Sequence, residues 1–210
     1  MQVDNLVLGA FETNCYVLRH DPAATQCLVI DTGLEARPLV DFLQADGLDP
    51  AALVLTHGHA DHIAGVADLR KNFPDMKVCI HRLDAPMLTG EQDNLSVLAG
   101  GTFRADPADF LIAEGDVIEH AAIRLEVIHT PGHTPGGICL YCRQDGIIFV
   151  GDTLFAGSVG RADFPGGSMR QLLKSINERI LVLPGQTIVY PGHGPPTTIS
   201  EEKTRNPFLS

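Results

Sequence analysis

Short apolar runs alternate with amphipathic stretches along the whole chain of 210 residues. The apolar runs are rich in the residues typical of β-strands and are separated by turn-forming residues. The predicted strands are Val3–Leu8, Cys15–Arg19, Gln26–Asp31, Leu53–Thr56, Lys77–His81, Ile123–Ile128, Gly137–Cys142, Ile147–Val150 and Thr187–Tyr190.

Three stretches place apolar residues at helical spacing and predict helices. They are Ala36–Ala45, Ile63–Asn72 and Met169–Val182, the last with Ser168 as its N-cap. Residues 84–116 have no clear period, and we expect short helices and a lid there. Because helices interrupt the strands repeatedly, the pattern favours sheets covered by helices over an all-β barrel. No linker divides the chain, so we expect a single domain over residues 1–210.

Composition narrows the classes of partner. The chain has 15 Lys and Arg against 26 Asp and Glu, a formal net charge of −11, which argues against nucleic-acid binding. No apolar run approaches the ~20 residues that cross a bilayer, and the N-terminus does not resemble a signal peptide. An odd number of cysteines, five, fits a reducing compartment, so we expect a cytoplasmic protein. The oligomeric state stays open.

One cysteine pair has the spacing of a metal-binding motif. Cys139 and Cys142 form a C-x-x-C sequence inside a predicted strand. Residues three apart in a strand face opposite sides, so we expect no shared metal there.

The sharpest chemical signal is the sequence H-G-H-A-D-H at residues 57–62. Imidazole nitrogens and carboxylate oxygens are ligands for Zn²⁺ and its first-row neighbours. His57 and His59, two residues apart in a turn, can face one ion. Asp61 and His62 lie where the next helix begins and can face a second ion.

Three later strands also lead into candidate ligands. They precede H-T-P-G-H-T-P-G at 129–136, G-D-T at 151–153 and P-G-H-G at 191–194. Side chains that follow neighbouring strands converge at one edge of a sheet. We therefore expect a histidine of 129–136, the Asp of 151–153 and the His of 191–194 to join the 57–62 segment in one two-ion site.

The combined motif resembles that of the metallo-β-lactamase superfamily, and the resemblance covers nearly the whole chain. It implies a mixed α/β (α+β) fold with four layers, an αββα sandwich, and two metal sites at one edge. The ligands of the first ion would be His57, His59 and His133. Those of the second would be Asp61, His62 and His193, with Asp152 bridging the two ions. Asp31, in V-I-D-T-G, would orient the ligand side chains. We expect two divalent ions, Zn²⁺ first, although the same ligands accept Fe or Mn²⁺.

Within the superfamily, residues 129–136, 151–167 and 202–209 are similar to the glyoxalase II group. Those enzymes hydrolyse S-acyl glutathione thioesters such as S-lactoylglutathione. The chain departs from the long enzymes because it lacks their C-terminal helical domain. Arg161 stands at their basic glutathione-binding position, Asp163 replaces a tyrosine, and Gly194-Pro195 replaces Glu-Tyr. The resemblance therefore implies the metal chemistry and leaves the thiol carrier open.

We expect hydrolysis of a small anionic thioester by a hydroxide that bridges the two ions, with Asp61 holding the hydroxide in line. A thiolate leaves without a general acid, which favours thioesters over amides. Arg161 would bind a substrate carboxylate, supported by Asp163. Phe155 and Phe164 could line the pocket. His129 is expected to pack at a strand end, and His20, His81 and His120 are expected at the surface.

Two other reactions remain open. Persulfide dioxygenases share the fold and the 57–62 motif but use one iron, whose ligands here would be His57, His133 and Asp152. The tail Gly194-Pro195-Pro196 differs from theirs and favours the hydrolase. A lactonase or β-lactamase would use the same ions with a different leaving group. A nuclease is disfavoured by the acidic balance.

Overall fold

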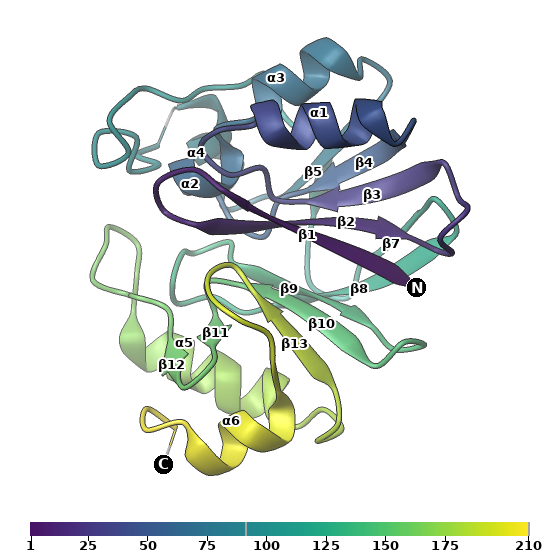
Figure 1. Cartoon of the computed structure of the whole chain (residues 1–210). Helices are drawn as coiled ribbons and strands as arrows, with labels where there is room; N and C mark the ends of the chain where they lie inside the picture. The colour runs from purple at the N-terminus through teal and green to yellow at the C-terminus, as the bar shows by residue number, and fades with distance from the viewer. Residues whose placement is uncertain (91, 210) are drawn as a thin grey trace.

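Two six-stranded sheets stack face to face in the computed structural model, which describes residues 1–90 and 92–209 (Figure 1). The first sheet runs β1 (Gln2–Leu8), β2 (Thr13–Arg19), β3 (Gln26–Ile30), β4 (Asp49–Val54), β5 (Lys77–His81) and β6 (Phe110–Ile112). The second runs β14 (Thr197–Thr198), β13 (Ile188–Pro191), β10 (Ile147–Gly151), β9 (Ile138–Cys142), β8 (Ile123–His129) and β7 (Val117–His120). A small ribbon joins β11 (Leu154–Phe155) to β12 (Ser158–Val159).

Buried side chains of both sheets meet in the middle layer of the core. Tyr16 and Leu28 from the first sheet pack in one cluster with Leu140 and Phe149 from the second. Tyr16 contacts Phe149 at a ring-centroid distance of 5.1 Å. This contact between inner faces holds the two sheets together.

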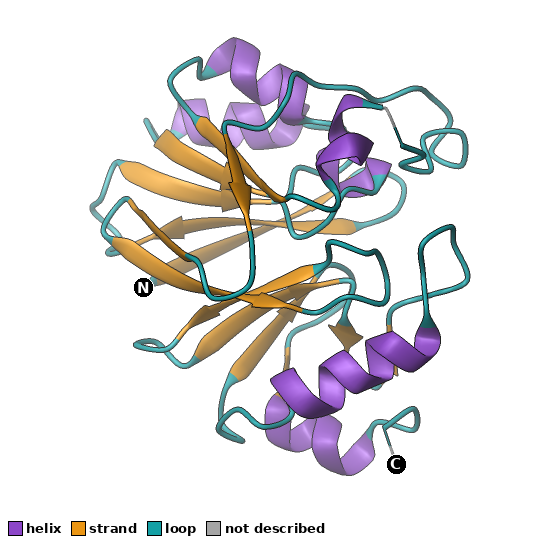
Figure 2. Ribbon diagram, turned by 180° about the vertical axis from the view of Figure 1, so that it is seen from behind, coloured by secondary structure: helices purple, strands orange, loops and turns teal. Residues whose placement is uncertain are grey.

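Helices cover both outer faces of the sheet pair (Figure 2). The helices are α1 (Arg37–Ala45), α2 (Ala60–Ile63), α3 (Val66–Asn72), α4 (Ala85–Thr89), α5 (Met169–Ser175), the π-helical turn η1 (Ile176–Ile180) and α6 (Ile199–Arg205). Leu39 and Leu69 pack on the first sheet, whereas Leu172, Ile176 and Ile199 pack on the second. The predicted four-layer αββα architecture is confirmed.

Several predicted boundaries were wrong. The predicted helix Ile63–Asn72 starts too early: α2 ends at Ile63, and α3 begins after Gly65 and ends at Asn72 as predicted. The chain passes so close there that a Cβ atom on Gly65 would lie 2.6 Å from the Cβ of Ala36. The strands β6, β7, β11, β12 and β14 and the helix α6 were not predicted, because most are too short to show a period. Ser168 does cap α5, since its hydroxyl accepts a hydrogen bond from the Gln171 amide.

Two other expectations are settled by burial. Cys139 packs outward against α5 and Cys142 packs toward the other sheet, so the C-x-x-C pair faces opposite sides as predicted. The expectation for His81 was wrong: it is 2% exposed, and its ring stacks on His129 at 4.3 Å.

No helix among the described residues is long and apolar enough to cross a membrane. The single domain over residues 1–210 stays a prediction.

The carboxyl ends of β4, β8, β10 and β13 lie at one edge of the sandwich, between the two sheets. Backbone hydrogen bonds join the segments that leave this edge: the Ile138 amide donates to the Thr56 carbonyl, and the Gly192 amide donates to the Gly151 carbonyl. Segments distant in sequence are thereby fixed side by side, which places the predicted ligands together.

Candidate metal centre

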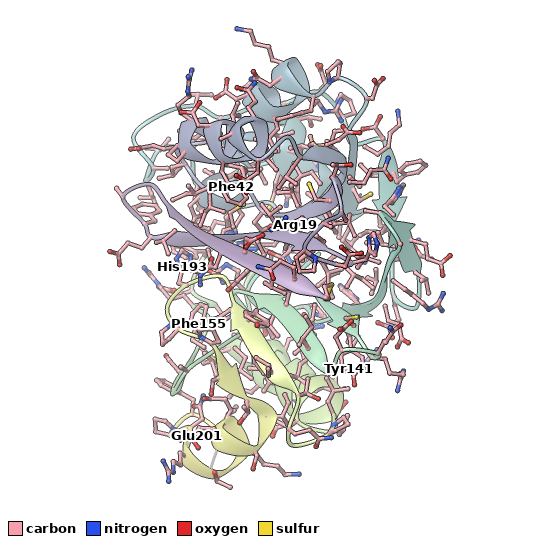
Figure 3. The ribbon with its side chains drawn as sticks, turned by 45° about the vertical axis from the view of Figure 1, so that its right-hand side comes forward. Arg19, Phe42, Tyr141, Phe155, His193 and Glu201 are labelled. Carbon is pink, nitrogen blue, oxygen red and sulfur yellow. The ribbon has the colours of Figure 1, made fainter. Side chains whose placement is uncertain are left out.

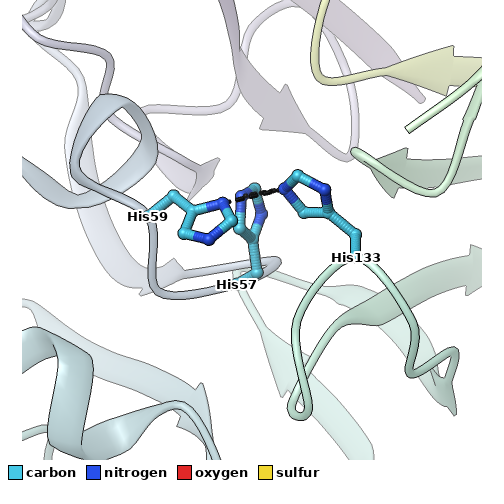
Figure 4. Close-up of side chains that lie close together, drawn as sticks. All are labelled: His57, His59 and His133. Atoms are coloured by element: carbon cyan, nitrogen blue, oxygen red, sulfur yellow. Dashed lines mark hydrogen bonds between the residues drawn. The ribbon is translucent and has the colours of Figure 1, made fainter. Parts of the chain in front are cut away.

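Three histidine rings converge on one point at the edge between the sheets (Figure 4). His57 and His59 come from the 57–62 segment after β4, and His133 comes from the loop between β8 and β9. His133 Nε2 lies 2.8 Å from His59 Nδ1 and 3.2 Å from His57 Nε2. All three residues are at least 95% buried. We call these residues the first group.

The protonation of two of these rings follows from their other nitrogens. His133 Nδ1 lies 2.6 Å from the Arg161 carbonyl oxygen, which can only accept, so His133 Nδ1 carries the proton. The Thr56 hydroxyl donates to Asp31, so it accepts from His57 Nδ1. In the neutral rings, both Nε2 atoms then present lone pairs to each other at 3.2 Å. Two facing lone pairs repel unless a cation lies between them, so the first group fits a metal ion.

A second group consists of Asp61, His62 and His193. His193 Nε2 lies 3.3 Å from Asp61 Oδ2, and His62 Nε2 lies 3.5 Å from the same oxygen. His62 donates from Nδ1 to Asp31, and His193 donates from Nδ1 to the Phe11 carbonyl, so in the neutral, metal-binding form each ring turns an Nε2 lone pair inward. These ligand atoms lie within 4.8 Å of one another.

Asp152 lies between the two groups. Its Oδ1 is 3.4 Å from His62 Nε2 and 3.5 Å from His193 Nε2, and its Oδ2 is 3.6 Å from His133 Nε2. His62 Nε2 and Asp152 Oδ1 are buried without a hydrogen-bond partner. Buried polar atoms without partners are rare in proteins, so these two atoms indicate a position where an ion binds. The structure thus brings together all seven predicted ligands, and their donor chemistry fits two metal ions.

The charges around the two groups differ. Burial, together with His62 and His133, lowers the pKa of His57 well below its usual value. Burial and His133 lower the pKa of His59 to about 3. Burial also disfavours the charged form of His62, but Asp61, Asp31 and Asp152 outweigh it and raise its pKa. The lowered pKa values favour neutral His57 and His59, and the carboxylates that raise the pKa of His62 create a negative environment, which together suit divalent cations.

Asp31 lies beneath the site, where it was predicted to orient other groups. Its carboxylate accepts hydrogen bonds from the Thr56 amide and hydroxyl at 2.8 Å each and from His62 Nδ1 at 2.9 Å. One carboxylate therefore fixes the start of the 57–62 segment and the orientation of a candidate ligand in the second group.

Asp84 holds the first group together and was missed in the sequence. It is fully buried and accepts hydrogen bonds from the Gly58 amide at 3.0 Å, the Thr134 hydroxyl at 2.7 Å and the Gly136 amide at 2.6 Å. A Cβ atom on Gly136 would lie 2.5 Å from Asp84 Oδ1, so this close approach requires glycine. Asp84 thereby ties the loop of His133 to the 57–62 segment.

The loop that carries His193 is held by the first sheet. The Asn14 side-chain amide donates to the Pro191 and Gly194 carbonyls, and the Tyr16 hydroxyl donates to the Pro191 carbonyl at 2.6 Å. Thr13 pairs with His193 as an isolated bridge. These residues belong to no sequence motif. Their role depends on contacts with segments distant in the chain, so it could not be predicted from the sequence.

A cavity of about 380 Å³ opens beside the two groups. Its described lining includes Phe155, Phe164 and Arg161, as predicted. Phe155 lies 6.1 Å from the His193 ring, and both are labelled in Figure 3. The Arg161 guanidinium lies 4.3 Å above the Phe164 ring and makes two hydrogen bonds to Asp163, at 2.9 and 2.7 Å. The predicted support of Arg161 by Asp163 is confirmed.

Relatives of known sequence resemble the whole chain. It is 36% identical to the probable metallo-hydrolase YqgX of Bacillus subtilis, over 100% of this chain and 98% of that protein. It is 32% identical to the hydroxyacylglutathione hydrolase GloC of Haemophilus influenzae, over 100% of this chain and 99% of that protein.

Solved structures agree with the fold. The crystal structure of BLEG-1 B3 metallo-beta-lactamase matches with a TM-score of 0.93 and 38% identity, over 100% of both chains. TTHA1623 in a di-iron-bound form matches with a TM-score of 0.88 and 37% identity, over 99% of this chain and 100% of that chain. The family model described as the metallo-beta-lactamase superfamily spans residues 8–193. With that span and these whole-length relatives, the chain belongs to the metallo-beta-lactamase superfamily.

Proposed function

We propose that the protein is a dinuclear metal-dependent hydrolase of S-acyl glutathione-type thioesters, such as S-lactoylglutathione. The observation that carries the proposal is the pair of ligand groups with Asp152 between them, at the floor of a cavity. The similarity to GloC, a hydroxyacylglutathione hydrolase, supports the substrate class. His57, His59 and His133 would hold one ion, and Asp61, His62 and His193 the other.

Two divalent cations held there would polarise the acyl carbonyl and lower the pKa of water toward neutrality. Asp61 is partly exposed on the cavity wall, where its carboxylate can accept a hydrogen bond from the attacking water and keep it in line. Phe155 and Phe164 exclude bulk water from the same wall. The thiolate leaves without a proton donor, so the chain needs no general acid.

Metal content and turnover measured on the same sample test the proposal. We expect two ions per chain and hydrolysis of S-lactoylglutathione that a chelator removes and Zn²⁺ restores. Hydrolysis without bound metal would contradict the proposal, as would two bound ions with no thioesterase activity.

A one-iron reaction is the second candidate, because three of its expected ligands lie close together: His57 Nε2 and His133 Nε2 are 3.2 Å apart, and Asp152 Oδ2 is 3.6 Å from His133 Nε2. The alternative reaction is that of a persulfide dioxygenase using His57, His133 and Asp152. One iron per chain with oxygen uptake on glutathione persulfide would establish it and exclude the hydrolase. If lactones or β-lactams are hydrolysed faster than thioesters, the metal site stays as proposed and the substrate class is reassigned.

Arg161→Ala is expected to raise KM for S-lactoylglutathione about fivefold, with kcat and metal content unchanged. The effect is modest because the Arg161 side chain is two-thirds exposed and already paired with Asp163. The orientation of His133 depends on the backbone carbonyl of residue 161 and survives the substitution. Asp163→Asn is the matched control and is expected to lower KM, because it frees the guanidinium for substrate. An unchanged KM in both variants would exclude Arg161 from substrate binding.

A further inference from the structure

The lining of the cavity beside the metal centre has two chemically different parts. In one part, Arg161 stacks on Phe164, whose ring lies 5.7 Å from the His59 ring. Arg161 is the one lysine or arginine among the described residues that line the cavity. Since a glutathione-type carrier bears carboxylates, we expect the carrier to bind at this charged part.

A second part of the lining, which we call the apolar end, carries no charged side chain. It is formed by Leu95, Leu98 and Ala99 from the segment before β6 and by Phe11 from the turn after β1. Leu98 is 63% exposed and Phe11 is 43% exposed, so this surface is open to water. A lactoyl group is small and polar and would leave it uncovered.

Hydrogen bonds fix this apolar end to the second ligand group. The Asn94 carbonyl accepts from the Ala60 amide at 2.7 Å, next to Asp61. The Phe11 carbonyl accepts from His193 Nδ1 at 2.9 Å. These two hydrogen bonds therefore fix the positions of the apolar side chains relative to Asp61 and His193.

The local backbone shows that Leu95 is held in place. It has φ +63°, an uncommon conformation for a residue with a side chain. The turn is maintained by the buried Asn94 side chain, whose amide donates to the Met87 and Phe103 carbonyls. Such a conformation persists only where surrounding contacts determine it.

We infer that the apolar end, which we call the acyl subsite (Phe11, Leu95, Leu98 and Ala99), binds an unbranched apolar acyl chain. This inference rests on the proposed thioesterase function and names its acyl group. With the carrier at Arg161 and the carbonyl at the ligand groups, the acyl chain extends along the subsite. Each methylene removed from water there adds to affinity.

A chain-length series tests the acyl subsite. Acetyl, butyryl, hexanoyl and octanoyl glutathione thioesters are compared with the metal-loaded protein. We expect kcat/KM to rise about two- to threefold per methylene, so that hexanoyl exceeds acetyl at least tenfold. Equal values for acetyl and hexanoyl would overturn the inference. A gain found only when the thiol is lengthened, as in S-hexyl against S-methyl thioacetate, would also overturn it, because the subsite would then hold the thiol.

Two neighbouring residues provide matched variants. Leu98→Ser is expected to remove most of the dependence on chain length. Val97→Ser is expected to retain it, because Val97 is 86% exposed and is not among the lining residues. Identical length dependence in both variants would count against the subsite.

Binding of the product acid separates this inference from the proposed function. Calorimetry on the metal-loaded protein is expected to show hexanoate binding at least tenfold more tightly than acetate, and Leu98→Ser is expected to reduce that ratio. If this holds but no thioester is hydrolysed, the acyl subsite stands and the thioesterase proposal fails. If thioesters are hydrolysed without any preference for acyl chain length, the thioesterase proposal stands and the acyl subsite fails.

Discussion

Asp152→Ala is expected to lose both metal ions and to lower thioester hydrolysis by a factor on the order of a thousand or more. Asp152 Oδ1 faces His62 and His193, whereas Oδ2 faces His133. The variant therefore removes the carboxylate oxygen that faces each ligand group. It also removes a negative charge that lies among the inward-facing imidazoles. Binding of any cation that these imidazoles share is therefore weakened.

The experiment compares metal per chain, by mass spectrometry after extensive dialysis, with turnover. Asp68→Ala is the matched control, because it removes an exposed carboxylate from α3, away from both ligand groups. Circular dichroism reports whether the variant is folded. Two tightly retained ions in folded Asp152→Ala would show that Asp152 does not bridge the ions.

The positions of the ligand side chains were predictable from the sequence, for a physical reason. A strand that ends at a sheet edge leaves a local signature, an apolar run followed by Gly or Pro, as before His133 and His193. Several such runs must end near one another when they share a sheet. The 57–62 motif adds local chemistry that needs no tertiary information.

The supporting contacts had no such signature. Asp84 follows 57–62 by more than twenty residues in a segment without a period, and its partners are backbone amides of other loops. The inward nitrogens of His133 and His193 are selected by backbone carbonyls of Arg161 and Phe11, which any residue type could supply. His81 lacked a partner in sequence spacing, yet β5 buries it against His129.

Asp84→Ala is expected to destabilise the fold by about 3 kcal/mol and to weaken the first group far more than the second. The substitution leaves the Gly58 amide, the Thr134 hydroxyl and the Gly136 amide without their buried acceptor. Each unsatisfied buried donor costs about 1–3 kcal/mol, partly relieved by relaxation or water. The two loops that Asp84 joins are those of His57, His59 and His133, so their convergence is lost first.

Metal titration against a competing chelator measures the two groups separately. We expect affinity at the first group to fall about 10- to 100-fold, the range seen when supporting hydrogen bonds to ligands are removed. The second group is expected to change little, because its carboxylate partner is Asp31. Asp84→Asn keeps one carbonyl acceptor and is expected to fall between the wild type and Asp84→Ala in both stability and affinity. Equal losses at both groups would mean that Asp84 supports the fold without positioning the first group, whereas an unchanged denaturation midpoint would contradict its three buried hydrogen bonds.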